Sequence, residues 1–123
     1  MKIVSIPKLD PTYAQRARLT TEVLLQGKGR IEILCAMRSG PVRLGQLARL
    51  IPAASKKMLT QNLRRLEGDG IVISSDLSDT TLHIEYDLSD GAREAVCALL
   101  DELAKWGDSY LMQVTISDGS KHQ

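Results

Sequence analysis

Apolar side chains recur at helical spacing along most of the chain, and short stretches rich in Gly, Pro and Ser separate the helices that this spacing predicts. Asp10-Pro11 is typical of a helix start, because Asp accepts hydrogen bonds from the first free amides and Pro fits the first turn. Gly and Pro mark the helix ends, since Gly adopts the left-handed cap and Pro cannot continue a helix. The predicted helices cover residues 12–26, 28–38, 44–50, 55–67 and 90–112.

The hydrophobic period changes to two between the fourth and fifth predicted helices. Residues 71–73 form a β-branched run, and apolar and polar residues alternate over 82–88, so two strands are predicted. The polar segment 74–81 between them is typical of a hairpin turn, and another short extended segment, 42–44, precedes the third helix. Two helices joined by a tight turn and followed by a hairpin predict a winged helix-turn-helix, an α+β fold that is mainly α.

The pattern predicts one domain with two flanking segments. Residues 1–11, which contain two prolines, are expected to form an N-terminal arm, residues 12–112 the winged domain, and the polar residues 113–123 a flexible tail. The last helix carries a seam whose steps alternate between four and three residues, as in paired helices. The seam consists of Ala92, Val96, Leu99, Leu103, Trp106 and Tyr110. It favours packing in the core or against a partner chain.

Charge is strongly asymmetric although the net charge is only +1. Residues 1–66 contain thirteen Lys or Arg against three Asp or Glu, whereas residues 67–123 contain three against twelve. A basic half of this size is typical of a surface for a polyanion, although the two halves can instead neutralise each other in the fold or across a dimer. The position of the cations on the predicted elements decides between these interpretations.

The fourth predicted helix concentrates cations on one face. On a helical wheel Leu59, Leu63 and Leu66 form a narrow apolar stripe that is expected to pack against the third helix. The opposite side is cationic and free of carboxylates before Glu67, whereas a solvated face usually mixes both signs of charge. Such a helix fits the major groove, where Arg and Lys pair with guanine and Gln with adenine, while hydroxyls and the helix start hold phosphates. The candidate DNA-binding residues here are Ser55, Lys56, Lys57, Thr60, Gln61, Arg64 and Arg65.

An ordered set of short motifs resembles the HxlR-type family of winged-helix transcriptional regulators, which are relatives of the MarR group. The matching residues, spread over 16–107 without a gap, include Gly27-Lys28, Ile33-Leu34, Gly40-Pro41, Leu63-Arg64-Arg65-Leu66-Glu67, Asp69-Gly70, Glu85-Tyr86-Asp87-Leu88-Ser89 and Trp106-Gly107. The resemblance implies a homodimer on operator DNA, with the fourth helix in the major groove and Arg43 as a phosphate contact. It places the dimer interface on the first and last helices, here at Ala14, Ala17, Val96, Leu99, Leu103, Trp106 and Tyr110.

The sequence departs from the family's pattern at four places. Arg16-Ala17 replaces the Cys-Pro whose cysteine some members use as a redox sensor, so redox sensing by that route is not expected. Gly29 replaces a tryptophan, which predicts weaker packing or a gap at that position. Ser74 replaces the wing arginine and Thr81-Leu82 replaces a Pro-Pro pair. Because the wing is also acidic, we do not expect it to contact DNA as family wings do.

Other chemistries have little support in the sequence. Cys35 and Cys97 do not lie in the Cys or His spacing of a metal site, and Cys35 is expected to be buried in an apolar helix. Nucleotide-binding and metalloprotease motifs do not occur, and the carboxylate pairs lack a partner group, so no enzyme, cofactor or metal is predicted. The apolar runs are too short to cross a membrane, and a cytoplasmic location is expected.

The sequence therefore predicts a homodimeric transcriptional regulator that binds double-stranded DNA at a pseudo-palindromic operator, with an effector that the residues do not identify. The alternative is a winged-helix module for protein interaction or dimerisation without specific DNA binding. The acidic wing favours this alternative, whereas the carboxylate-free fourth helix favours DNA. Binding to a duplex of random sequence separates the two hypotheses.

Overall fold

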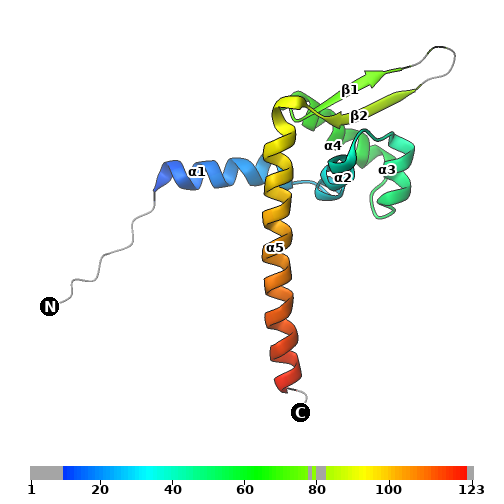
Figure 1. The fold of residues 1–123 in the computed structure, drawn as a ribbon. Coiled ribbons are helices and arrows are strands. Elements are labelled where there is room, and N and C mark those ends of the chain that lie inside the picture. The colour runs from blue at the N-terminus through cyan, green and yellow to red at the C-terminus, as the bar shows by residue number, and fades with distance from the viewer. Residues whose placement is uncertain (1–9, 78, 80–82, 122–123) are drawn as a thin grey trace.

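The computed structural model describes residues 10–77, 79 and 83–121, with side chains as far as Ile116. Helices α1 (Pro11–Thr20), α2 (Arg30–Ala36), α3 (Leu44–Leu50) and α4 (Lys56–Gly68) precede strands β1 (Val72–Asp76) and β2 (Ile84–Leu88), and α5 (Asp90–Lys121) follows them (Figure 1). A π-helical turn, Thr21–Leu25, extends α1, and a 3-10 turn, Met37–Ser39, ends α2. The predicted fold class, a mainly α winged helix-turn-helix with a small sheet, is confirmed.

The wing is an antiparallel hairpin in which β1 and β2 pair as far as Asp76 opposite Ile84. β1 therefore continues through polar residues that predicted a turn, because each of them meets a strand partner with free backbone groups. Val42 forms a two-way backbone bridge to Tyr86, with N···O distances of 2.8 Å in both directions. The bridge confirms the extended conformation predicted before α3 and ties this segment to the wing.

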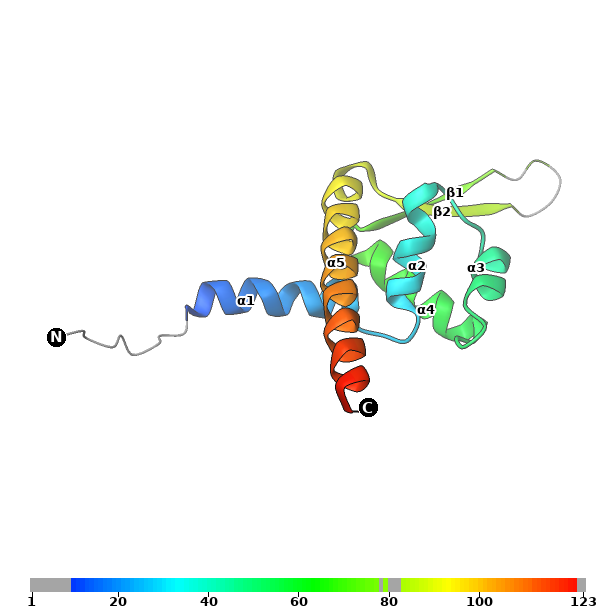
Figure 2. The same cartoon turned by 60° about the horizontal axis from the view of Figure 1, so that its bottom comes forward.

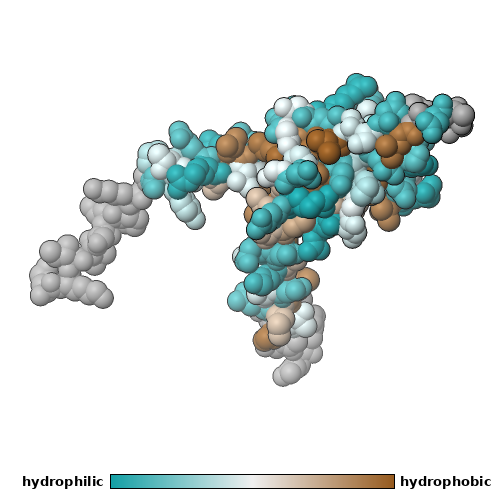
Figure 3. Space-filling view, turned by 45° about the horizontal axis from the view of Figure 1, so that its top comes forward, coloured by the Kyte–Doolittle hydropathy of each residue, from teal (hydrophilic) through white to brown (hydrophobic). Residues whose placement is uncertain are grey.

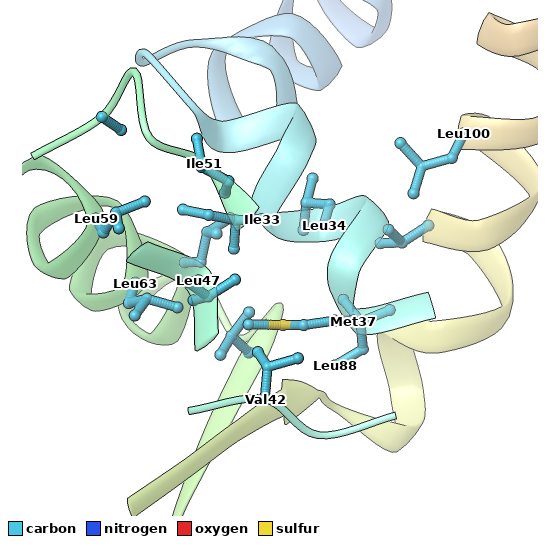
Figure 4. Packing of buried hydrophobic residues seen from close by; sticks show 14 residues of the cluster. Ile33, Leu34, Met37, Val42, Leu47, Ile51, Leu59, Leu63, Leu88 and Leu100 are labelled. Carbon is cyan, nitrogen blue, oxygen red and sulfur yellow. The ribbon is translucent and has the colours of Figure 1, made fainter. Parts of the chain in front are cut away.

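The core lies where α2, α3, α4, the hairpin and the first half of α5 meet (Figure 4). Leu59, Leu63 and Leu66 of α4 are at most 1% exposed, so the apolar stripe predicted on this helix is confirmed. The other buried apolar residues are Ile33, Leu34, Met37, Val42, Leu47, Ile51, Ala54, Val72, Leu88, Val96 and Leu100. Because burying a large apolar side chain contributes about 1.5–3 kcal/mol, this cluster fixes the orientation of α4.

The start of α2 depends on two glycines with positive φ. Gly27 has φ +93° and Gly29 has φ +84°, so the chain becomes helical only at Arg30 rather than at the predicted residue 28. A Cβ at Gly29 would lie 3.3 Å from the Cβ of Ala54. The expectation of a gap at this position is therefore wrong, because the turn between α3 and α4 packs directly against the glycine.

Helix α1 and the far half of α5 extend away from the winged unit (Figures 1 and 2). Asp10 caps α1 as predicted, since its Oδ1 accepts hydrogen bonds from the amides of Thr12 at 2.9 Å and Tyr13 at 3.2 Å. The pattern predicted that the last helix ends near residue 112, but α5 continues to Lys121. Each further residue adds one backbone hydrogen bond to an established helix, so a polar sequence without proline continues it.

Among the described residues, no helix is both long and apolar enough to cross a bilayer.

Candidate nucleic-acid interface

Helix α4 presents one face to the core and the other to solvent. Ser55 caps its start, and the hydroxyl oxygen accepts a hydrogen bond from the amide of Met58 at 3.2 Å. The outward residues Lys56, Lys57, Gln61, Arg64 and Arg65 are all exposed, as is Ser55. Thr60 is half-buried, and its hydroxyl donates to the carbonyl of Lys56 at 2.8 Å. The structure thus brings the seven residues predicted on this helix together, with Thr60 at the edge of the exposed face.

The exposed face of α4 carries positive charge without an acidic neighbour on the same helix until its last turn. Glu67 is the first carboxylate, and its Oε2 accepts a hydrogen bond from the hydroxyl of Ser74 in β1 at 2.9 Å. Lys56, Lys57, Arg64 and Arg65 form no ion pair with another described residue. Their charges are therefore available to an external anion.

Arg43 lies at the N-terminal cap of α3 and contacts the wing. Its backbone amide donates to Oε1 of Gln46 at 2.8 Å, and its Nη2 lies 2.6 Å from Nδ1 of His83. His83 Nε2 in turn lies 3.3 Å from Oε2 of Glu85. The bridge between Val42 and β2 brings these side chains together. Arg43 is exposed, so its contact with the wing leaves the guanidinium accessible to solvent.

A buried polar pair that sequence reasoning missed anchors α4. Arg30 and Asn62 are each only 6% exposed. The Nε and Nη2 of Arg30 donate to Oδ1 of Asn62 at 3.0 and 2.8 Å, and Nη1 donates to the carbonyl of Val23 at 3.1 Å. Asn62 Nδ2 donates to the carbonyl of Lys28 at 3.0 Å. The available signal was Asn62 itself, an amide among the leucines on the inward side of the helix.

Burial is the main cause of the lowered pKa of Arg30, and the positive charge of Arg65 lowers the pKa further. Asp69 acts in the opposite direction. The first cause reflects a guanidinium that has left water, and the second is repulsion between two positive charges.

The candidate dimer residues divide between exposed and buried positions. Trp106 is 68% exposed, Tyr110 is 52% exposed, and Ala17 is also exposed. Ala14, Leu99 and Leu103 are half-buried. Val96 is only 3% exposed and packs in the core of its own chain, so its expected place in the interface is wrong. The described end of α5 adds Leu111, Met112 and Ile116, which are more than 60% exposed and were not among the predicted interface residues.

The cysteines and the position of the expected redox motif offer little support for thiol chemistry. Cys35 is exposed on α2, which contradicts the expectation of burial, and the partial desolvation that remains there raises the pKa of its thiol. Cys97 is half-buried. Arg16, where the family has cysteine, places its guanidinium carbon 5.8 Å from the ring centroid of Tyr13. Within the described part of the chain, no three His, Cys, Asp or Glu residues cluster as metal ligands would.

Comparison with known proteins agrees with this geometry. The HxlR-like helix-turn-helix family matches residues 24–115. YtcD, an uncharacterized HTH-type transcriptional regulator of Bacillus subtilis strain 168, is 38% identical over 102 residues, which cover 83% of this chain and 79% of YtcD. YdzF, another such regulator of the same organism, is 39% identical over 85 residues, which cover 68% of this chain and 77% of YdzF.

Two solved structures have the same architecture. The crystal structure of ytcD superposes with a TM-score of 0.70 at 36% identity and covers 77% of this chain and 95% of its own. The redox regulator HypR in its reduced form superposes with a TM-score of 0.70 at 29% identity, and the match covers 76% of this chain and 91% of HypR. The family match includes the whole winged unit and most of α5. The chain therefore belongs to the HxlR-like helix-turn-helix family.

Proposed function

We propose that this protein is a transcriptional regulator that binds double-stranded DNA as a homodimer, with α4 of each subunit in the major groove. The exposed face of α4 is the observation that carries the proposal. It combines four cationic side chains, which have no ion-pair partner among the described residues, with the amide side chain of Gln61. The opposite face of the helix is buried in the core. The major groove is about 12 Å wide and admits such a helix. The family relatives are described as transcriptional regulators, which supports the same conclusion.

The residues of the α4 face have different roles in the proposed complex. Lys57, Gln61 and Arg64 are placed to read base edges, since Lys and Arg pair with guanine and Gln with adenine. Ser55, Lys56, Thr60, Arg65 and Arg43 are assigned to the phosphate backbone, which fixes the register of the helix. Neutralised phosphates supply most of the affinity, and the base contacts supply the specificity.

Exposed apolar surface supports the homodimer. The aromatic rings of Trp106 and Tyr110 stack with their centroids 5.4 Å apart on the projecting part of α5. A hollow of about 550 Å³ lies where the end of α1 meets the start of α5, lined by Leu24, Ile71 and Leu99 among others. Apolar colour appears at this junction and in separate patches on the otherwise mostly hydrophilic projecting helix (Figure 3). Several large apolar side chains exposed on one helix beside an apolar hollow are typical of a protein interface, and a symmetric partner is the simplest one.

The proposal predicts a loss of operator binding when side chains on the exposed face of α4 are truncated. Operators are first obtained by selection from random duplexes. The double substitution Lys57→Ala with Arg64→Ala is expected to weaken operator binding by roughly 100-fold or more, because each base contact contributes about 1–3 kcal/mol. Fluorescence anisotropy with a labelled operator measures the change.

The matched control removes one lysine and one arginine elsewhere. Arg38→Ala with Lys105→Ala deletes two cations that form exposed ion pairs with Asp101 and Glu102, and it should retain operator affinity within a few-fold. Unchanged operator binding in the Lys57 and Arg64 variant would place the recognition surface elsewhere. Failure of the native chain to bind any duplex would favour the alternative, a winged-helix module for protein interaction.

A further inference from the structure

A polar hollow of about 490 Å³ lies between the start of α2 and the middle of α4. Its walls include Gly27, Lys28, Gln61 and Arg65, and its polar floor includes Arg30 and Asn62. Three of these side chains are cationic. None of the lining residues is acidic, so the hollow differs from an ordinary surface depression with mixed charge.

Arg30 has no carboxylate partner in direct contact among the described residues, and only Asp69 acts favourably on its charge from a longer distance. The hydrogen-bond acceptors of Arg30 among the described residues are neutral oxygens, namely Oδ1 of Asn62 and the carbonyls of Glu22 and Val23. No described carboxylate lies within ion-pair distance of Arg30, Lys28 or Arg65. A nearly buried guanidinium without a counter-charge is costly, and neighbouring cations add repulsion. An anion in the hollow would relieve both costs.

The floor of the hollow is held rigidly. Asn62 fixes the guanidinium plane through two hydrogen bonds and is itself fixed by the carbonyl of Lys28. Gly27 has to lack a side chain, because a Cβ there would lie 2.5 Å from Oδ1 of Asn62 and 3.3 Å from Nη2 of Arg30. The donors are therefore ordered before any ligand arrives, which lowers the entropic cost of binding.

We propose that this hollow is a phosphate site, in which Arg30, Lys28 and Arg65 bind the oxygens of one phosphate group. The exposed guanidinium of Arg65 matches phosphate geometrically, and Lys28 adds a mobile point charge. Arg30, most of whose N–H groups already donate to Asn62, Glu22 and Val23, adds its fixed positive charge and the remaining N–H of Nη2. Gln61 and Arg65 also belong to the α4 face, so the site adjoins the proposed DNA-binding surface. The bound phosphate group belongs either to the backbone of bound DNA or to a free phosphorylated small molecule. The first of these possibilities rests on the proposed function. Lys28 joins the binding residues in both cases.

The first arm of the test uses inorganic phosphate and the full chain without DNA. Phosphate is titrated at constant ionic strength against chloride, while nitrogen–proton NMR follows the Nε–H of Arg30 and the amides of Lys28 and Gln61. We expect a saturable shift at these groups that is lost in Lys28→Gln. Lys105→Gln, which removes an exposed lysine on α5, should keep the wild-type response. Circular dichroism of Lys28→Gln and Lys105→Gln checks that both variants keep the native fold.

The second arm measures affinity for a random duplex as salt is varied. If the hollow binds a DNA phosphate, Lys28→Gln should reduce the magnitude of the log–log slope by about 0.9, and Lys105→Gln should not. A saturable phosphate shift with an unchanged slope assigns the site to a free phosphorylated ligand. A reduced slope without a shift assigns it to phosphate presented by DNA.

Two results separate the failure of this inference from the failure of the proposed function. Absence of a phosphate shift together with an unchanged slope overturns the phosphate site, while the wild-type chain still binds duplex. A wild-type chain that binds no duplex overturns the proposed function. The phosphate titration alone then decides whether the hollow binds phosphate.

Discussion

Single glycines determine how the segment before α2 packs. Gly29 is left-handed and sits against Ala54, so Gly29→Ala should lower the free energy of unfolding by about 1–3 kcal/mol through backbone strain and overpacking. Gly68→Ala is the matched control, because a Cβ at this helical position meets nothing within 4 Å. It should leave stability unchanged or raise it by up to about 1 kcal/mol. Urea denaturation measures both, and equal effects would contradict the packing described at Gly29.

The buried amide of Asn62 is the residue on which the Arg30 network depends. Asn62→Ala leaves a nearly buried guanidinium without its main acceptor, so we expect a loss of about 2–3 kcal/mol in the free energy of unfolding. Gln61→Ala, an exposed amide one residue earlier, should change stability by no more than about 0.5 kcal/mol. A denaturation midpoint for Asn62→Ala equal to that of Gln61→Ala would show that the network contributes nothing to folding.

Residue positions on α4 could be predicted because one periodic pattern decides both faces. The three leucines of the stripe specify what is inside, and the exposed cations then follow from geometry. Arg30 could not be predicted as buried, since an arginine at a helix start normally faces water. Its burial depends on an acceptor 32 residues away in the sequence. Long-range polar partners leave no local pattern.

At the level of elements, local signals predicted the type and order of every helix and strand of the winged unit. Their ends were harder to predict. The start of α2 is delayed by the left-handed glycines, and β1 is lengthened by its pairing with β2. The polar residues after 112 predict an earlier end for α5 than the structure shows, because polarity alone does not end a helix, whereas proline or a lack of backbone hydrogen bonds does.

Helix α1 is expected to lose its N-terminal cap in acid. The hydroxyl of Thr12 and then the amide of Tyr13 hold the pKa of Asp10 below its ordinary value near 3.8. Because the folded pKa is lowered, the cap stabilises the helix fully above the ordinary pKa, and this contribution is lost as the pH falls through the lowered pKa. NMR titration of the amides of Thr12 and Tyr13 should show a midpoint below 3.8.

Asp10→Asn keeps a capping oxygen but removes the titrating group. Its amides should show no transition attributable to residue 10 over the same pH range. A midpoint for the native Asp10 at or above the ordinary aspartate value would show that these hydrogen bonds are not maintained in solution.

The whole molecule separates its charges in space as well as in sequence. Most of the cations lie on or between α1 and α4, whereas most of the carboxylates lie on the wing and α5. The cations attract a duplex held against α4, and repulsion from the carboxylates keeps the duplex away from α5. In the proposed complex the projecting half of α5 is then left for a partner chain rather than for DNA. This arrangement makes dimer formation and DNA binding separable by mutation.

That separation yields a test of the homodimer. Trp106 is 68% exposed within one chain, so a partner that covers it would bury one of the largest side chains in the protein. Trp106→Glu should raise the dimer dissociation constant at least about tenfold, because a charge replaces buried aromatic area in both subunits. Sedimentation equilibrium of the native and substituted chains measures the constant.

Leu50→Glu is the matched control, since Leu50 is 65% exposed on α3, which lies away from α1 and α5 (Figures 1 and 2). It introduces the same charge at a similarly exposed apolar position and should leave the dimer constant unchanged. An operator with two half-sites should lose affinity for the Trp106 variant, because two linked helices bind cooperatively and two free ones do not. A native chain that sediments as a monomer at all concentrations, or a Trp106 variant that dimerises as the native chain does, would place the interface elsewhere or remove it.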